Sequence, residues 1–285
     1  MPILQIIENP EKHRWADLLA RPVFHSEKLE LNVRKILEDV KSKGDKAVDE
    51  YSLLFDQIVV VDRIVRQEEF EAAENKLDEK LKASIRQAKQ NISTFHSNQL
   101  IQEPKVETQP GIRCWRKSVA IEKVGLYIPG GTAPLFSTLL MLGVPAILAG
   151  CQEIIICTPP QKDGTIHPAI LFVAKLLGMR NLFRVGGVQA IAAMAYGTKT
   201  IPQVYKIFGP GNQYVTQAKK LIQQEGIAID MPAGPSELAV YADETAVPAY
   251  VAADLLSQCE HGADSQVILV TGSRAFAEKV NLALE

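Results

Sequence analysis

The sequence predicts an α/β fold with two Rossmann-like parallel-sheet domains preceded by a helical N-terminal segment, and three observations favour it. The first part of the chain, to about Thr108, carries apolar residues at helical spacing. From Ser118 onward, short apolar runs typical of strands alternate with longer helical segments, which implies βαβ units on a parallel sheet. Glycine-rich turns follow several of these strands, but none matches G-x-G-x-x-G, so the usual dinucleotide fingerprint is absent.

The helical part consists of two long amphipathic stretches. Residues 26–56 place apolar side chains at helical intervals with a break at Gly44, and residues 68–100 continue as a second long helix. Most of the charged side chains in these stretches face water in this interpretation.

The alternating part is predicted element by element from its apolar runs. We expect strands at residues 119–129, 153–160, 181–187, 204–211 and 237–243, and helices at residues 138–150, 167–179, 188–198 and 212–226. A final unit adds a helix at residues 248–262 and a strand at residues 265–272. In such folds ligands bind at the carboxyl ends of the strands.

The helix predicted at residues 248–262 carries two possible ligand donors in its last turn. Pro248 suits the first turn and Gly262 the end, which puts Gln258 and His261 one turn apart on one face. The free carbonyls there favour a bound cation. Two donors do not complete a metal site, glutamine is a weak predictor of zinc, and a histidine at a helix end also caps carbonyls.

Charge and apolar content point to small-molecule partners. The 31 basic and 33 acidic residues give a net charge of −2 and a pI near 6.3, which leaves no signature of nucleic-acid or membrane-surface binding. The uncharged stretch at residues 124–151 is interrupted by Gly130, Gly131, Pro134 and Pro145, so we expect a strand end, a turn and a short apolar helix rather than a membrane span.

The compartment is predicted from the cysteines and the N-terminus. The four cysteines form no C-x-x-C pair, which argues against a zinc ribbon or a redox motif and suits a reducing cytoplasm. The opening MPILQIIENPEKHRW has charged residues where a signal peptide carries its apolar core. We therefore expect a cytoplasmic protein.

Three glycine-rich turns at predicted strand ends carry polar neighbours. Residues 128–132, 185–189 and 208–212 read IPGGT, VGGVQ and FGPGN, and beside them lie Tyr127, Gln189 and Asn212. Glycine allows close approach of backbone to a ligand, and convergent polar groups orient a nucleotide or a polar substrate. Taken singly, each of these residues is equally well explained as a turn or capping residue.

The segment MPAGPSE at residues 231–237 is a further rigid turn. It places the hydroxyl of Ser236 beside the carboxylate of Glu237, but it does not match the nucleophile elbow G-x-S-x-G. Hydrolase chemistry is therefore disfavoured.

Four motifs, taken together, resemble the histidinol dehydrogenase family: VGLYIPGGTAPLFST, GPGNQYVTQAK, DMPAGPSELAVYAD and AADLLSQCEHGADSQ, at residues 124–138, 209–219, 230–243 and 252–266. The resemblance implies a zinc-dependent, NAD-linked, four-electron oxidation of L-histidinol through the aldehyde to L-histidine, the last two steps of histidine biosynthesis. It also implies a homodimer.

The resemblance assigns roles to matching residues. Tyr127, Gln189 and Asn212 match the NAD-contacting residues of the family. Ser236 matches a substrate-binding serine, and Gln258 and His261 match two zinc ligands that also lie near the substrate.

Family members are much longer, so the chain resembles a C-terminally truncated one. The remaining zinc ligands and the acid/base pair, a glutamate followed by a histidine, are expected beyond Glu285, so no catalytic acid or base is expected within this chain and little or no activity is expected of it alone. By the same resemblance, residues 1–24 form an N-terminal arm, residues 25–125 with 237–285 an incomplete first α/β domain, and residues 126–236 a second Rossmann-like domain.

Two alternatives to a zinc- and NAD-dependent enzyme stay open at this point. One is a truncated, non-catalytic remnant that folds and binds nucleotide or a partner subunit. The other is a different dehydrogenase or aldehyde-handling enzyme that uses Cys114 or Cys151 as its nucleophile.

Overall fold

A computed structural model describes residues 4–20, 27–58, 62–100, 103–130, 134–232, 237–259 and 265–285. The chain divides into two compact units: a larger one, Ser26–Pro232, and a smaller one, Met1–His25 with Ala233–Glu285. The expected division into residues 1–24, residues 25–125 with 237–285, and residues 126–236 stays a prediction.

The larger unit is built on a parallel sheet of five strands, in the order β5-β4-β3-β6-β7. The chain moves outward from β3 through β4 to β5 and then crosses back to place β6 on the other side of β3. The carboxyl ends of β3 and β6 therefore flank the topological switch point, where open α/β sheets bind ligands. The strands are β3 (Lys123–Tyr127), β4 (Glu153–Thr158), β5 (Leu182–Arg184), β6 (Lys206–Phe208) and β7 (Ala228–Ile229).

Helices cover both faces of this sheet, and a separate apolar core lies between each face and its helices. One core includes residues of α2 (Glu27–Lys43), α3 (Asp45–Asp56), α8 (Gly187–Tyr196) and α9 (Gln213–Gln224). The other includes residues of α4 (Gln67–Glu74), α5 (Glu79–Ser97), α6 (Phe136–Ala149) and α7 (Pro168–Leu176). The α/β fold with a parallel sheet and a helical N-terminal part is thus confirmed.

The helices follow their sequence patterns closely. In α2 the buried side chains are Val33, Ile36, Leu37 and Val40, the spacing of one face of a helix. Helix α5 begins at the cap Asp78, whose carboxylate accepts a hydrogen bond from the backbone N–H of Leu81 at 2.7 Å.

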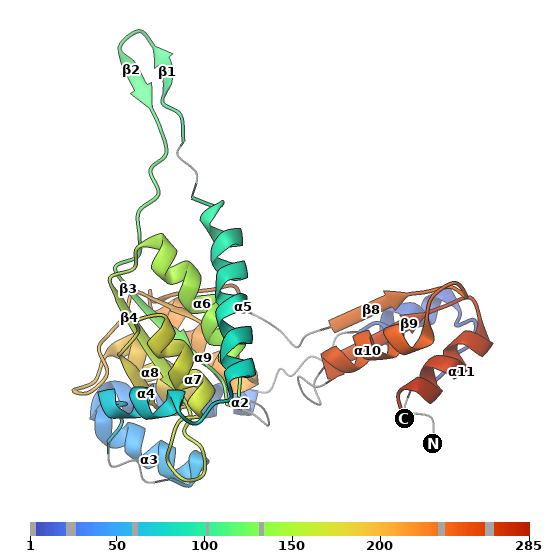
Figure 1. Cartoon of the computed structure of the whole chain (residues 1–285), viewed down its shortest axis with the longest axis horizontal. Coiled ribbons are helices and arrows are strands. Elements are labelled where there is room, and N and C mark those ends of the chain that lie inside the picture. The colour runs from blue at the N-terminus through green and yellow to red at the C-terminus, as the bar shows by residue number, and fades with distance from the viewer. Residues whose placement is uncertain are drawn as a thin grey trace. The chain divides into compact units, whose positions relative to one another are not determined.

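Helix α6 runs from Phe136 to Ala149 and contains Pro145, in agreement with the helix expected at residues 138–150. One detail of the larger unit differs from expectation. An antiparallel hairpin of β1 (Val106–Gln109) and β2 (Ile112–Cys114), which the sequence patterns did not indicate, follows α5 and projects away from the helices (Figure 1). All residues of its two strands are exposed, and the Lys105 ammonium lies 4.8 Å from the ring centre of Trp115 at its base.

A short segment after α3 is tied to the edge strand of the sheet. The N–H of Val65 donates to the carbonyl of Leu182 at 2.9 Å, and the N–H of Arg184 donates to the carbonyl of Arg63 at 2.8 Å. The Arg184 guanidinium also donates to the carbonyls of Asp62 and Ile64, both at 2.9 Å. These bonds bring the chain that leaves α3 to the carboxyl end of β5.

The smaller unit contains one βαβ unit. Strands β8 (Glu237–Tyr241) and β9 (Gln266–Val270) pair in parallel, and α10 (Pro248–Cys259) connects them. Helices α10 and α11 (Arg274–Ala283) supply most of its small core. The N-terminal η1 (Lys12–Arg14) and α1 (Trp15–Leu18) also belong to this unit.

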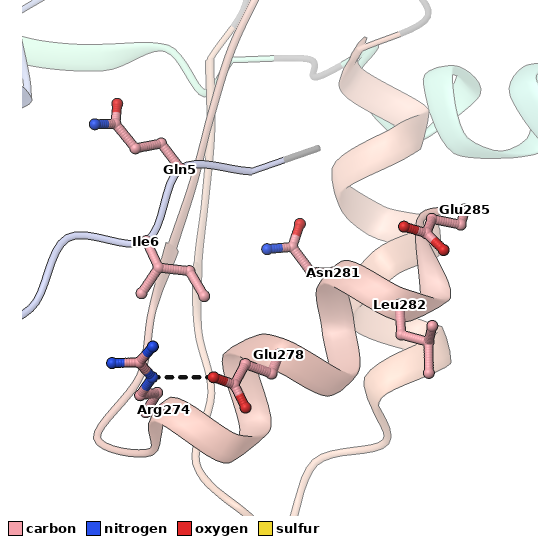
Figure 2. Close-up of a pocket in the computed structure, with 7 residues that line it drawn as sticks. All are labelled: Gln5, Ile6, Arg274, Glu278, Asn281, Leu282 and Glu285. Atoms are coloured by element: carbon pink, nitrogen blue, oxygen red, sulfur yellow. Dashed lines mark hydrogen bonds and ion pairs between the residues drawn. The ribbon is translucent and has the colours of Figure 1, made fainter. Parts of the chain in front are cut away.

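The N-terminal segment is fastened to α11 beside a small pocket (Figure 2). The side-chain amide of Asn281 pairs with the backbone of Leu4, accepting from its N–H at 2.8 Å and donating to its carbonyl at 3.1 Å. Arg274 forms ion pairs with Glu8 and, along its own helix, with Glu278. Within the described part of the chain, no helix is both long enough and apolar enough to cross a membrane.

Candidate functional site

Tyr127 is the last residue of β3, and its side chain reaches the start of α8. Its hydroxyl accepts a hydrogen bond from the backbone N–H of Gly187 at 3.1 Å. The side chain is buried, and this burial raises the pKa of Tyr127 to about 12. The residue is therefore a neutral phenol at the switch point, with its own proton available for donation.

Gln189 lies in the first turn of α8, two residues after Gly187, whose N–H donates to this hydroxyl. The side chain is only 1% exposed, yet neither its amide oxygen nor its amide nitrogen has a hydrogen-bond partner among the described residues. Buried polar groups are nearly always paired, because an unpaired one costs about 1–3 kcal/mol. An amide that is left unpaired at the switch point is a group that a bound ligand can satisfy.

Gly187 makes room for this amide. Its φ of +62° favours glycine, and a Cβ atom there would lie 2.8 Å from the amide oxygen of Gln189. The glycine-rich turn VGGVQ is thus explained by the side chain that follows it.

Asn212 serves as the N-cap of α9. Its side-chain oxygen accepts hydrogen bonds from the backbone N–H groups of Tyr214 and Val215, both at 3.1 Å. The capping interpretation is therefore correct for the oxygen, and a ligand contact would use the amide nitrogen.

A buried ion pair holds the loop that follows β6. Lys219 is buried, pairs with Asp230, and donates to the carbonyl of Gly209 at 2.8 Å. Asp230 in turn accepts from the N–H of Gly209 at 2.8 Å. Gly209 has a φ of +134°, and a Cβ atom there would lie 2.1 Å from the carbonyl oxygen of Tyr127. The loop between β6 and α9 is therefore fixed tightly against the end of β3.

Pro159 links the ends of three strands. It follows β4 directly, and Cβ atoms built at Gly130 and Gly186 would lie 2.5 Å and 2.6 Å from its ring. The turns after β3 and β5 therefore need glycine because both pack on one proline.

Asp56, the last residue of α3, carries a further unpaired group. Its Oδ2 atom is buried and has no hydrogen-bond partner within the residues described, and burial raises the pKa of this carboxyl group. Its negative charge also contributes to the raised pKa of Tyr127.

In the smaller unit, Gln258 lies near the end of α10. Its Nε2 atom is buried and has no partner in the described part of the chain. Since the two ends of an amide are distinguished only by their hydrogen bonds, this side chain is free to present oxygen or nitrogen to a ligand. Pro248 is the first residue of α10, as expected.

Comparison with known proteins identifies the relatives of this chain. The family model described as histidinol dehydrogenase matches residues 19–285. The chain belongs to the histidinol dehydrogenase family.

Several family members resemble it throughout. The histidinol dehydrogenase of Bacteroides thetaiotaomicron is 57% identical over 278 residues, which are 98% of this chain and 65% of the relative. That of Escherichia coli (strain K12) is 51% identical over 271 residues, 94% of this chain and 62% of the relative. The crystal structure of histidinol dehydrogenase from Elizabethkingia anophelis superposes with a TM-score of 0.90 at 50% identity, over 97% of this chain and 64% of that chain. The chain thus spans just under two thirds of the length of these family members.

The residues expected from the family are only partly brought together. Tyr127 and Gln189 both lie at Gly187, the first residue of α8, and Asn212 follows the loop that packs against Tyr127. Gln258 belongs to the smaller unit. Ser236 and His261 lie outside the described residues, so their roles stay predictions. Within the described ranges, no group of three or more histidine, cysteine, aspartate or glutamate side chains is close enough to hold a metal.

The structure gives little support to the alternative of a different enzyme that uses Cys114 or Cys151 as its nucleophile. Cys151 lies just before β4, at the edge of the sheet opposite the strand carboxyl ends, and its burial raises the pKa of its thiol. Cys114 is exposed at the end of the projecting hairpin. Neither position suits a nucleophile at the switch point.

Sequence patterns did not single out Asp56, Lys219 or Asp230. Lys219 and Asp230 could have been suspected, because both stand inside motifs quoted for the family resemblance. Asp56 had no such signal, since it ends an ordinary amphipathic helix.

Proposed function

We propose that the complete protein is a histidinol dehydrogenase, which oxidises L-histidinol through the aldehyde to L-histidine with two molecules of NAD and a zinc ion. Family membership supports the reaction. The observation that carries the assignment to residues is that Gln189 and Gln258, the two glutamines that the resemblance assigns to ligands, both have buried side-chain atoms without partners.

Tyr127, Gln189 and Asn212 would hold the cofactor. The Tyr127 phenol, which accepts from the Gly187 N–H, and the unpaired amide of Gln189, two residues farther on, offer hydrogen-bond donors and an acceptor in a buried setting, which suits the polar groups of a dinucleotide. The Lys219–Asp230 pair fixes the loop that carries Asn212. NAD held by these residues would supply the hydride acceptor for both oxidation steps.

Gln258 and His261 would contribute two zinc ligands, and Ser236 a substrate contact. The amide of Gln258 fits this role, because its buried Nε2 has no partner and the amide can turn over to present its oxygen to a cation at the end of α10. Zinc, when bound, supplies a Lewis acid that fixes the amino alcohol. Holding the substrate in one orientation between two cofactor exchanges is the contribution expected of these residues.

Proton transfer is assigned elsewhere. The resemblance attributes it to a glutamate followed by a histidine that come after residue 285 in the family. Loss of such groups lowers rates by about 10²- to 10⁴-fold each. We therefore expect the 285-residue chain alone to show little or no turnover, and zinc bound weakly through two protein donors.

The test compares this chain with the same chain extended by the C-terminal segment of the Bacteroides thetaiotaomicron relative. NADH formation from histidinol is followed with NAD and zinc present, while calorimetry measures NAD binding to both proteins. Turnover by the extended protein alone is the expected result. Turnover by the unextended chain at a similar rate would contradict the assignment of the acid/base pair, and a folded extended protein without turnover would contradict the proposed reaction.

The complete protein is also proposed to be a homodimer located in the cytoplasm. Sedimentation of the extended protein tests the first point. A single species at the mass of one chain would contradict it.

A further inference from the structure

Asp56 is held at the carboxyl edge of the parallel sheet. Two residues after it, Ile58 contacts the loop that follows β4, where a Cβ atom at Gly164 would lie 3.9 Å from the Ile58 side chain. Further on, the backbone carbonyl of Arg63 accepts a hydrogen bond from the backbone N–H of Arg184, the last residue of β5. Helix α3 therefore ends where the carboxyl ends of β4 and β5 lie.

The carboxylate of Asp56 has no structural task in the described part of the chain. One of its oxygens is buried, and the residues described supply neither a hydrogen bond nor an ion pair for it. A carboxylate oxygen that is buried without a partner destabilises a fold, even when the rest of the group meets solvent, so its presence at a ligand-binding edge calls for a ligand. Tyr127 and Gln189 lie at the same edge. The negative charge of Asp56 helps to raise the pKa of Tyr127, and the side-chain amide of Gln189, like the Asp56 oxygen, has no partner among the described residues.

The sheet itself lacks the acidic residue that this topology usually supplies. In dinucleotide-binding sheets with this strand order, an acidic residue at the end of the second strand accepts a hydrogen bond from the ribose 2′-hydroxyl. The second strand here is β4, and it ends in Thr158 followed by Pro159 and Pro160. Asp163, farther along the loop, is exposed and engaged with the N–H and hydroxyl of Thr165 at 2.9 Å and 2.7 Å.

We propose that Asp56 takes the place of that missing residue: it accepts a hydrogen bond from the adenosine ribose of the bound dinucleotide and sets the preference for NAD over NADP. The inference rests on the proposed function, because it concerns the same cofactor site. Its physical basis is simple. The carboxylate attracts a ribose 2′-hydroxyl and repels the 2′-phosphate that NADP carries at that position.

The experiment measures the affinity of the 285-residue chain for NAD and for NADP by isothermal titration calorimetry, before and after the isosteric substitution Asp56→Asn. Asp163→Asn is the matched control, since it removes a carboxylate from the same edge of the sheet. Asp56→Ser repeats the test with a smaller side chain, and far-ultraviolet circular dichroism checks that each variant is folded.

We expect Asp56→Asn to weaken NAD binding by about 10- to 100-fold, the range for a hydrogen bond to a charged group, while NADP binding improves or stays the same. Asp163→Asn should leave both affinities within about twofold of the parent chain, as is usual for an exposed residue. Unchanged NAD affinity, as an ordered water beneath Asp56 would give, overturns the inference, and so does equal weakening for both nucleotides. If the parent chain binds no NAD, the proposed cofactor site itself is wrong and this inference falls with it.

Discussion

At the residue scale, the candidate site is marked by a buried side-chain amide, that of Gln189, which has no partner among the described residues. The positions of Tyr127 and Gln189 were predictable because both lie at glycine-rich turns that follow strands. The hydrogen bond from the Gly187 N–H to the Tyr127 hydroxyl and the unpaired amide of Gln189 were not predictable, since both depend on how α8 begins. Asp56 could not be predicted at all, because its sequence neighbourhood is that of any amphipathic helix and only the fold brings it to the sheet edge.

Replacing Gln189 with methionine separates stability from binding. Gln189→Met removes two unpaired polar atoms at nearly constant shape, so the free energy of unfolding should rise by about 1 kcal/mol while NAD affinity falls about tenfold or more. Gln203→Met is the matched control: this glutamine donates to the carbonyl of Ala195 at 2.9 Å, and its loss should destabilise the protein. Urea denaturation followed by circular dichroism measures both. A destabilised Gln189→Met would show that the amide has a partner in the free protein.

The carboxyl group of Asp56 should make stability depend on pH. Its folded pKa is raised above the ordinary 3.8, so the native state holds the proton more tightly and the ionised group destabilises the fold as pH rises through this pKa. Asp56→Asn should therefore be more stable than the parent chain by roughly 1 kcal/mol at about pH 7, a modest value because the group is only partly buried.

The same comparison repeated at about pH 3.5 should show a much smaller difference, because both states then carry a largely protonated carboxyl. Urea midpoints at the two pH values provide the measurement. An advantage of the variant that grows toward acid pH would contradict a destabilising carboxylate at Asp56.

At the element scale, the loop between β6 and α9 depends on a buried ion pair that the apolar sequence patterns do not indicate. Alternating apolar runs located the strand and the helix correctly, and they also located the other strands of the sheet except the short β7. The loop conformation needed Lys219 and Asp230, and a lysine within an amphipathic helix is ordinarily taken to face water. The hairpin β1–β2 was missed for the opposite reason, since its exposed strands bury no side chain and so carry no apolar pattern.

Lys219→Met should destabilise the larger unit by about 3 kcal/mol, the low end for breaking a buried pair, because Asp230 is partly exposed. Lys220→Met, one residue along the same helix and only partly buried, should change stability by no more than about 0.5 kcal/mol. Thermal unfolding followed by circular dichroism distinguishes them. Similar effects of the two substitutions would remove the special role given to the buried pair.

At the scale of the whole molecule, the family fold was predictable because the alternation of strands and helices extends over most of the chain. The division into units was less so, since it depends on which helices pack on which sheet. The larger unit has an apolar core on each face of five strands, whereas the smaller one packs a few residues of α10 and α11 on two strands. Stability grows with the surface that a domain buries.

Differential scanning calorimetry of the 285-residue chain should therefore give two transitions, with the smaller unit unfolding first. Hydrogen exchange followed by mass spectrometry assigns them: peptides from α10 and β9 should lose protection at lower denaturant than peptides from β3 and β4. One cooperative transition with uniform protection would mean that the two units stabilise each other strongly.

The placement of Trp115 at the base of the hairpin has an optical consequence. The chain has two tryptophans, Trp15 in the smaller unit and Trp115 in the larger one, and they are 47% and 55% exposed. Both indoles are already in contact with solvent in the native state, so the wavelength of their emission maximum should shift little when either unit unfolds. Intrinsic tryptophan fluorescence is therefore a poor reporter of unfolding for this protein. Because this emission stays nearly constant, a third indole introduced at Phe208, beside the Gly209 loop, would report on the proposed cofactor site above an unchanging background.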